Sequence, residues 1–208
     1  MTATGRVHPR SVLTVAGACF LALTVTIVLL GSIPADVSVR QGLLALASPA
    51  VVGAMRVVNR AGDWRVLLPG TLLLFVVFRR ARQTWWLWVA LMALAPTLEW
   101  VVKQLVGRTR PESLAMSYPS GHSTAAAAFF GAVMYLADAL PPRLRAWVRA
   151  LAMAMILLVG MARVILRAHW PSDVLAGIAL GLALAAAAGL LASRKQNHTG
   201  SPSSSSSR

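Results

Sequence analysis

The segment 11–31 holds no charged residue over 21 positions, and this run is the first constraint on the fold. A helix of that length rises about 30 Å at about 1.5 Å per residue, which matches the hydrocarbon core of a bilayer. The rest of the chain agrees, because 57% of its residues are hydrophobic and 12% are charged, whereas a soluble domain has about 25% charged residues. The sequence therefore predicts an integral membrane protein.

Six apolar segments predict transmembrane helices in one all-α, polytopic membrane domain over residues 1–192. These segments are 11–31, 64–80, 84–106, 122–140, 146–167 and 172–192. The segment 40–63 is less apolar and contains Pro49 and three arginines, which favours an interfacial or re-entrant helix between the first two spans. A seventh span is the alternative. Residues 193–208 are Ser-rich and predict a disordered tail.

The first apolar run has a second interpretation as a secretory signal peptide, since Arg6 and Arg10 precede it. An uncleaved first helix is favoured for two reasons. The run exceeds the usual apolar core of a signal, and Gly31-Ser32-Ile33 is a poor cleavage site.

With six spans, the basic clusters all fall on one side of the membrane. They are Arg6, Arg10, Arg79, Arg80, Arg82, Arg143, Arg145, Arg149, Arg194 and Lys195. The positive-inside rule predicts that this side, which holds both termini, faces the cytoplasm, and the expected location is a bacterial-type inner membrane. The net charge of +14 does not indicate nucleic-acid binding, because the arginines form short clusters and no basic face with interleaved aromatic residues is visible.

The polar stretch Pro119-Ser120-Gly121-His122 stands just before an apolar run on the opposite side of the membrane. This placement is typical of a helix N-terminus, where backbone N–H groups lack intrahelical partners and carry partial positive charge. A Ser-Gly turn entering a helix is a candidate anion site. We expect the N–H groups around Ser120 and Gly121 to bind an anion there.

Five cations, namely Lys103, Arg108, Arg110, Arg163 and Arg167, outnumber the three carboxylates expected near this anion site. Lys103, Arg110 and Arg163 lie at or near membrane depth, where an isolated cation is costly and needs a partner. The carboxylates expected nearby are Glu99, Glu112 and Asp173. An excess of cations beside a helix N-terminus favours a phosphate group as the missing partner.

Three other charged residues on this side are not assigned to phosphate binding. Arg108 and Arg167 are interpreted as ordinary interface anchors. Glu99 stands one turn before Lys103 on the same predicted helix, so it either positions that lysine or is an interfacial carboxylate.

Two histidines give the cluster its predicted chemistry. Asp173 follows His169 by four residues, so its carboxylate is expected to accept a hydrogen bond from one ring nitrogen and leave the other free to attack phosphorus. His122 would protonate the departing oxygen. Zinc binding is the alternative, but no third ligand stands at a familiar spacing, and no metal or cofactor is expected.

The three motifs together resemble the type 2 phosphatidic acid phosphatase superfamily, which includes lipid phosphate phosphatases and vanadium haloperoxidases. The motifs are Lys103 with six residues to Arg110-Pro111, then Pro119-Ser120-Gly121-His122, then Arg163 with five residues to His169 and three more to Asp173. The resemblance implies six transmembrane helices and a metal-independent site on the outer face. One departure is Ala162, where many members have serine.

The resemblance also implies a role for each matching residue. His169 would be the nucleophile, His122 the general acid and Asp173 the orienting carboxylate. The residues expected to bind phosphate are Lys103, Arg110, Ser120, Gly121 and Arg163.

The expected substrate is a membrane lipid phosphate, with undecaprenyl pyrophosphate as the first choice by analogy to bacterial members of the superfamily. Phosphatidylglycerophosphate, phosphatidic acid and lipid A are the alternatives. A transporter of an anionic substrate is the rival of another class, although no repeated halves are visible. The oligomeric state is left open by the sequence.

Overall fold

The computed structural model describes residues 8–199. Its longer helices are α1 (Pro9–Leu30), α2 (Pro34–Ala45), α3 (Pro49–Asn59), α4 (Trp64–Val77), α6 (Trp85–Val106), α7 (Gly121–Leu136), α8 (Pro142–Ile165) and α9 (Pro171–Thr199). The short elements are α5 (Arg79–Gln83), the 3-10 turns η1 (Arg60–Gly62) and η2 (Ala137–Ala139), and an antiparallel hairpin of β1 (Thr109–Arg110) and β2 (Ser113–Met116). The all-α membrane fold class is confirmed.

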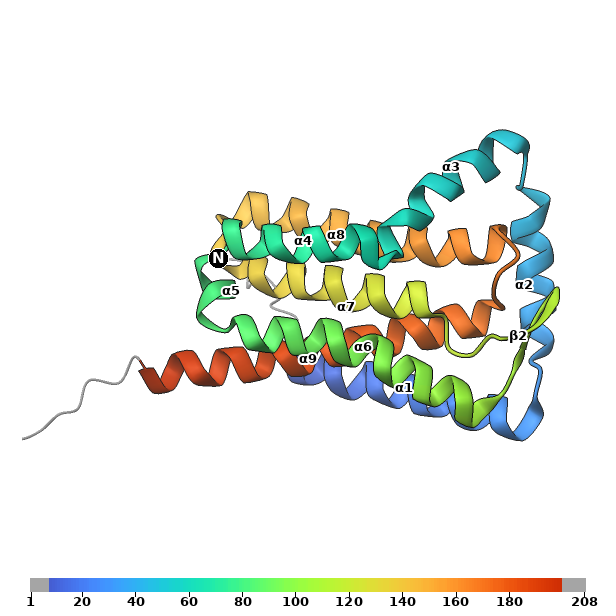
Figure 1. Ribbon diagram of the computed structural model, residues 1–208, viewed down its shortest axis with the longest axis horizontal. Coiled ribbons are helices and arrows are strands. Elements are labelled where there is room, and N and C mark those ends of the chain that lie inside the picture. Colours follow the sequence, from blue (N-terminus) through green and yellow to red (C-terminus); the bar gives the residue numbers. More distant parts are fainter. Residues whose placement is uncertain (1–7, 200–208) are drawn as a thin grey trace, which may run out of the picture.

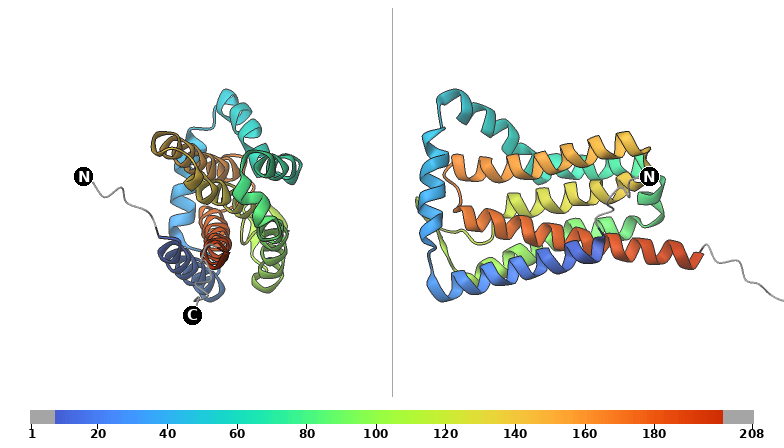
Figure 2. Two further views of the ribbon diagram at one scale, coloured as in Figure 1. Left: turned by 90° about the vertical axis from the view of Figure 1, so that its left-hand side faces the viewer. Right: turned by 180° about the vertical axis from the view of Figure 1, so that it is seen from behind.

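The long helices α1, α4, α6, α7, α8 and α9 run side by side along the longest axis, and α2 crosses one end of this bundle (Figure 1). Figure 2 shows the same arrangement from behind, with α3 leading obliquely from α2 back towards α4. The β-hairpin lies at the end that α2 crosses. That end also holds the last turns of α6 and α8 and the first turns of α7 and α9 (Figure 1).

Helices α7 and α9 pack closely at the centre because small residues line their contact. A Cβ added at Gly177 of α9 would lie 2.6 Å from the carbonyl oxygen of Ser120, and one at Gly181 would overlap the carbonyl oxygen of Thr124. Ala126 and Ala127 of α7 are fully buried. Glycine is required at these two positions of α9 by the close approach of the α7 backbone.

Four helices, α1, α6, α8 and α9, are long and apolar enough to cross a membrane. The pair α2 and α3 would add a fifth as a broken span, with a bend of 114° between its halves. Helix α4 is apolar but has 14 residues, and α7 has 16, so each rises less than about 25 Å. Length and composition therefore support four or five spans, and the predicted number of six is not confirmed.

The segment 40–63 differs in detail from its prediction. It contains the end of α2 and all of α3, and Pro49 begins the second helix instead of interrupting a longer one. Proline fits a first helical turn because its N–H would lack a partner there, and the Ser48 hydroxyl accepts a hydrogen bond from Val51 N at 3.3 Å. A single straight seventh helix is not present among the described residues.

The C-terminal prediction is wrong in part. Helix α9 continues through Thr199, so residues 193–199 are helical, whereas 200–208 lie outside the described residues. The hairpin β1–β2 was not predicted from the sequence.

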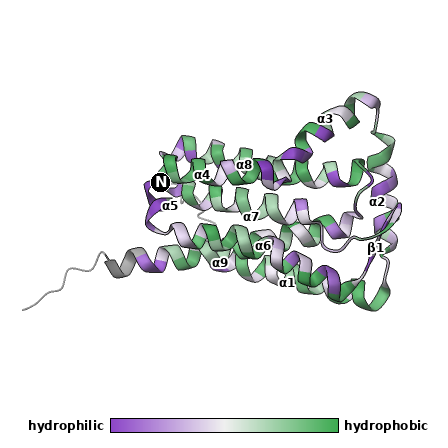
Figure 3. Cartoon of the chain, in the orientation of Figure 1, coloured by the Kyte–Doolittle hydropathy of each residue, from purple (hydrophilic) through white to green (hydrophobic). Residues whose placement is uncertain are grey.

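The described residues of the basic clusters on α5, at the start of α8 and near the end of α9 lie at the end of the bundle away from α2, whereas Arg6 lies outside the described residues. Figure 3 shows α5, which carries three arginines, as hydrophilic at that end, beside the start of α8 and near the end of α9. The two ends of the molecule thus differ in charge in the way the positive-inside rule describes.

Candidate active site

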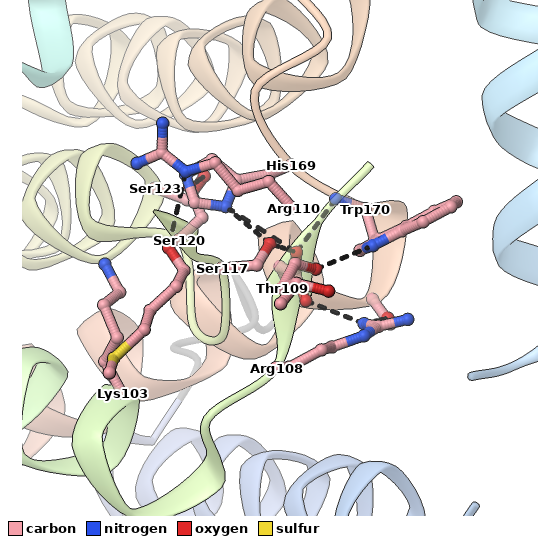
Figure 4. A network of polar contacts seen from close by, with 12 residues as sticks. Lys103, Arg108, Thr109, Arg110, Ser117, Ser120, Ser123, His169 and Trp170 are labelled. Carbon is pink, nitrogen blue, oxygen red and sulfur yellow. Dashed lines mark hydrogen bonds and ion pairs between the residues drawn. The ribbon is translucent and has the colours of Figure 1, made fainter. Parts of the chain in front are cut away.

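The predicted site residues lie at the end of the bundle that α2 crosses, and Figure 4 shows four of them, namely Lys103, Arg110, Ser120 and His169. They come from six places in the chain: Lys103 from the last turn of α6, Arg110 from β1, Ser120, Gly121 and His122 from the start of α7, Arg163 from the last turn of α8, His169 from the loop before α9, and Asp173 from the first turn of α9. The topology brings them together because α6 and α8 end where α7 and α9 begin.

The loop before α7 is held in place by buried polar contacts. Ser120 is the N-cap residue, with an extended backbone, and its N–H donates to the carbonyl oxygen of Asp173 at 2.9 Å. Its hydroxyl accepts from Ser123 at 3.0 Å and keeps its own hydrogen available as a donor. The peptide bond between Tyr118 and Pro119 is cis. Residues 117–120 are all buried.

These contacts refine the predicted anion site. The N–H of Ser120 is already used by Asp173, so this group is not a free donor. The N–H groups of Gly121 and His122 begin α7, where a helix provides no acceptor. A ligand at this helix N-terminus would therefore meet these two N–H groups and the Ser120 hydroxyl.

The carboxylate of Asp173 is fully buried and accepts several hydrogen bonds. Its Oδ2 accepts from Trp170 N at 2.9 Å and from the hydroxyl of Ser117. The distance from Oδ2 to His169 Nδ1 is 3.6 Å, longer than an ordinary hydrogen bond. The Ser117 hydroxyl also lies 3.4 Å from that nitrogen, so it bridges the pair that was predicted to bond directly.

His169 is 2% exposed. Burial holds the pKa of its imidazole below the ordinary value, and the positive charges of Arg163 and Arg110 act in the same direction, while Asp173 opposes them. The ring is therefore neutral near pH 7. With Nδ1 facing Asp173, the tautomer that this environment favours carries its proton on Nδ1 and leaves the lone pair of Nε2 free.

Arg108 is not an interface anchor, and that prediction is wrong. Its side chain is 7% exposed, and its Nη1 donates to Asp173 Oδ1 and to Ser172 Oγ, both at 2.7 Å. Its Nη2 donates to Asp36 Oδ2, also at 2.7 Å. The chain turns back after α6 and carries this side chain over the start of α9. Figure 4 shows Arg108 on the side of Trp170, away from Lys103 and Arg110.

Asp36 and Ser117 are polar residues of this cluster that sequence reasoning missed. Asp36 lies in the first turn of α2 and was not expected near this cluster. Its contact with Ser172 spans 136 positions of the sequence, which no local pattern indicates. Ser117 stands two positions before Pro119, where the second motif begins, and that proximity is the signal that could have found it.

The remaining cations differ in their partners. Lys103 forms an ion pair with Glu99 one turn earlier on α6, and the Glu99 carboxylate also packs against Gly121. Arg163 donates from Nη1 to Asn59 Oδ1 at 2.9 Å, and its buried Nε has no hydrogen-bond partner among the described residues. Figure 4 shows Lys103 on the side of Ser120.

Arg110 and Arg163 are the cations left for an anion. Arg110 makes a long hydrogen bond of 3.4 Å to the carbonyl oxygen of Met116, and within residues 8–199 neither of the two pairs with a carboxylate. Arg167, in contrast, has a side chain that is 59% exposed and lies 3.1 Å from Glu112. Its interpretation as a surface anchor stays a prediction.

No group of three His, Cys, Asp or Glu residues among those described is arranged to hold a metal ion. The charge that the site offers to an anion comes from its arginines, its lysine and the start of α7.

Comparison with known proteins gives consistent matches. Residues 112–196 match the PAP2 superfamily, a segment that includes the second and third motifs and begins just after Arg110. The chain is 40% identical to a lipid A 1-phosphatase of Rhizobium johnstonii over 97 residues, which cover 39% of this chain and 36% of that protein. It thus spans about a third of that relative's length.

Longer matches cover most of both proteins. The chain is 29% identical to phosphatidylglycerophosphatase B of Bacillus subtilis over 161 residues, which cover 72% of this chain and 79% of the relative. It is 27% identical to a decaprenylphosphoryl-5-phosphoribose phosphatase of Mycobacterium tuberculosis over 170 residues, which cover 75% of this chain and 88% of the relative.

The fold matches a solved structure over nearly its whole length. The crystal structure of a transmembrane PAP2 type phosphatidylglycerolphosphate phosphatase from Bacillus subtilis superposes with a TM-score of 0.71 and 25% identity, covering 93% of this chain and 98% of that one. The family match, the curated relatives and this structure agree that the chain is similar in sequence and fold to PAP2 phosphatases.

Proposed function

We propose that the chain is a metal-independent lipid phosphatase that works through a phosphohistidine intermediate. The observation that carries this proposal is the environment of His169. Its ring is buried and neutral, its Nδ1 faces Asp173 through Ser117, and two arginines without carboxylate partners stand near it. A neutral imidazole with a free Nε2 beside uncompensated positive charge is suited to attack a phosphorus atom.

Binding would hold the phosphoryl group by its non-bridging oxygens. Arg110 and Arg163 supply forked donors, and Lys103 adds a point charge. The N–H of Gly121 and the hydroxyl of Ser120 donate from the start of α7. These groups are fixed before substrate arrives, so little reorganisation is needed when charge moves during the reaction.

The reaction then has two steps. In the first, His169 Nε2 bonds to phosphorus while the bond from phosphorus to the leaving oxygen breaks, and His122 transfers a proton to that oxygen. Asp173 stabilises the positive charge that develops on the imidazole. In the second, water attacks the phosphohistidine as His122 takes up its proton, and inorganic phosphate departs with His169 restored.

An apolar cavity of about 280 Å³ between α4 and α6 supports a lipid substrate. It starts near the site, because its lining includes Ala125, one turn after His122, and Pro96, one turn before Glu99. It extends along α4 to Phe75. A hydrocarbon chain in this cavity would leave its phosphate at the end of the bundle.

The orientation follows from charge. The basic clusters at the far end of the bundle favour a cytoplasmic position for both termini, which would direct the site to the exterior or periplasm. Undecaprenyl pyrophosphate is our first candidate at that face. The names of the relatives add lipid A, phosphatidylglycerophosphate and decaprenylphosphoryl-5-phosphoribose, and phosphatidic acid completes the set.

The test is phosphate release by the purified protein in detergent with EDTA, on each of these five lipids, beside His169→Ala. Loss of such a nucleophile lowers kcat by about ten-thousand-fold or more. Quenching in base should trap a base-stable, acid-labile phosphohistidine in the wild type and none in the variant. No release from any lipid, or equal release from the variant, would refute the proposal and favour a transporter, which would move labelled substrate without His169.

A further inference from the structure

Helix α2 contributes a buried carboxylate to the site. Asp36 is 2% exposed, although α2 lies across the end of the bundle and most of its other residues are exposed. Its Oδ1 accepts from Ser172 N at 2.8 Å, and its Oδ2 accepts from Ser172 Oγ at 2.6 Å and from Arg108 Nη2 at 2.7 Å. A buried carboxylate is unfavourable unless it is paired and hydrogen-bonded, and this one is matched by three donors.

The same arginine holds the catalytic carboxylate. While Nη2 of Arg108 bonds to Asp36, Nη1 bonds to Asp173 Oδ1 at 2.7 Å. Asp173 is thereby held by Arg108 on one oxygen and by Ser117 and Trp170 N on the other, the oxygen that faces His169. A continuous polar path leads from α2 to the imidazole.

Two physical effects follow from sharing Arg108 between two carboxylates. The first is geometric, because an arginine with one carboxylate partner favours a bidentate arrangement, which would rotate Asp173 away from Ser117 and His169. The second is electrostatic, because Asp36 offsets the charge of Arg108 and leaves Asp173 its negative charge for stabilising the imidazolium.

We propose that Asp36 is a positioning residue for the Asp173 and His169 pair, acting through Arg108. The kinetic part of this inference rests on the proposed phosphatase function. Within residues 8–199, no hydrogen bond or ion pair joins Asp36 to the anion site itself, and its effect is transmitted by the guanidinium.

A second contact fixes α2 one turn further on. Arg40 forms an ion pair with Glu112 of the hairpin loop, and its guanidinium carbon lies 5.7 Å from the centre of the Trp170 ring. The guanidinium carbon of Arg108 lies 5.5 Å from the centre of the same ring. Removal of the Asp36 charge should therefore leave α2 attached.

The test begins with Asp36→Asn, which keeps size and removes charge. Relative to wild type, kcat on the fastest lipid of the panel should fall about 10- to 100-fold, as expected when a group that orients a reacting residue is lost, while KM changes by less than about threefold. Asp138→Asn is the matched control, because that carboxylate is exposed and pairs with Arg145 and Arg149 at the far end. It should leave kcat unchanged.

Two further measurements separate positioning from a purely structural role. In an Asp173→Asn background, Asp36→Asn should lower kcat little further, because the path from Asp36 to His169 through Asp173 is already broken. The NMR titration of the His169 ring should move to lower pH in Asp36→Asn, because a negative charge is lost. The charged groups that face this ring are Asp173 from α9, Arg163 from α8 and Arg110 from β1, with His122 from α7, and they remain.

Several results would overturn the inference. These are an unchanged kcat in folded Asp36→Asn, an equal loss in both backgrounds, or an unmoved ring titration. If Asp36→Asn does not fold, the charged variant Asp36→Glu is compared with the neutral variant Asp36→Gln. Equal kcat values for these two variants would refute the positioning role of Asp36. A wild type inactive on every lipid refutes the proposed function instead, and the ring titration still decides the positioning of His169.

Discussion

The contact of α9 with the start of α7 makes Gly177→Ala a direct test of how the site is built. Gly177 stands one turn after Asp173, and a Cβ there would lie 2.6 Å from the carbonyl oxygen of Ser120. Carbon and oxygen atoms in close contact are about 3.3 Å apart or more. The substitution therefore needs a shift of about 0.7 Å between the α9 backbone and the residue that begins the anion site.

This shift should reduce activity more than stability. Overpacking costs about 1–3 kcal/mol, and alanine recovers about 1 kcal/mol through its better helix propensity, so the free energy of unfolding should fall by about 2 kcal/mol at most. Catalysis is more sensitive, because a displacement of about 1 Å can reduce a rate about a hundredfold. We expect kcat/KM to fall about 10- to 100-fold.

The assay is phosphate release beside thermal unfolding in the same detergent. Gly53→Ala is the matched control, since it lies within α3 and a Cβ there meets no heavy atom within 4 Å. Gly53→Ala should keep full activity, and its free energy of unfolding should rise by up to about 1 kcal/mol. Wild-type kcat/KM in Gly177→Ala would refute the argument that close packing of α7 on α9 sets the position of Ser120.

Three other predictions test the site. Glu99→Gln should raise KM and lower kcat/KM about tenfold if Glu99 positions Lys103, and unchanged phosphate release would leave it an interfacial carboxylate. Asn59→Ala removes the hydrogen bond to Arg163, a charge-assisted bond of about 1.5–3 kcal/mol, so kcat/KM should fall about 10-fold or more, and equal kinetics would contradict this tether. The proposed attack requires neutral His169, whose pKa is lowered by burial. The acid limb of the pH profile of kcat/KM should therefore have its midpoint below about pH 6.5. Two lipids with different phosphate ionisation should give the same midpoint, and a midpoint above that value would contradict the assignment of His169.

The sequence predicted the parts of this site that local patterns define. The motifs stand at the ends of the third and fifth apolar runs and at the starts of the fourth and sixth, and the order of the runs determines which ends share a side of the membrane. That reasoning brought Lys103, His122 and His169 to one face. It needed no knowledge of packing, because in a membrane the length and direction of each helix are set by the bilayer.

The residues that were missed or misassigned depend on long-range contacts. Asp36 finds its partners more than 70 positions away, and the bend between α2 and α3 is set by packing. Arg108 stands two positions from Arg110, and although the motif singled out Arg110, no local pattern indicated that Arg108 would be buried against two carboxylates. The difference between them comes from which arginine meets buried carboxylates when the chain folds.

That difference produces an electric field across the imidazole of His169. On its Nδ1 side lie Asp173, Arg108 and Asp36, a set with one net negative charge. For the phosphate there remain Arg110 and Arg163, two positive charges without carboxylates, while Lys103 is balanced by Glu99. In the proposed reaction, attack by Nε2 would move negative charge towards the phosphoryl oxygens and would leave positive charge on the ring. A field with this sign stabilises both changes, and it requires that one arginine of the pair Arg108 and Arg110 be neutralised and the other left free.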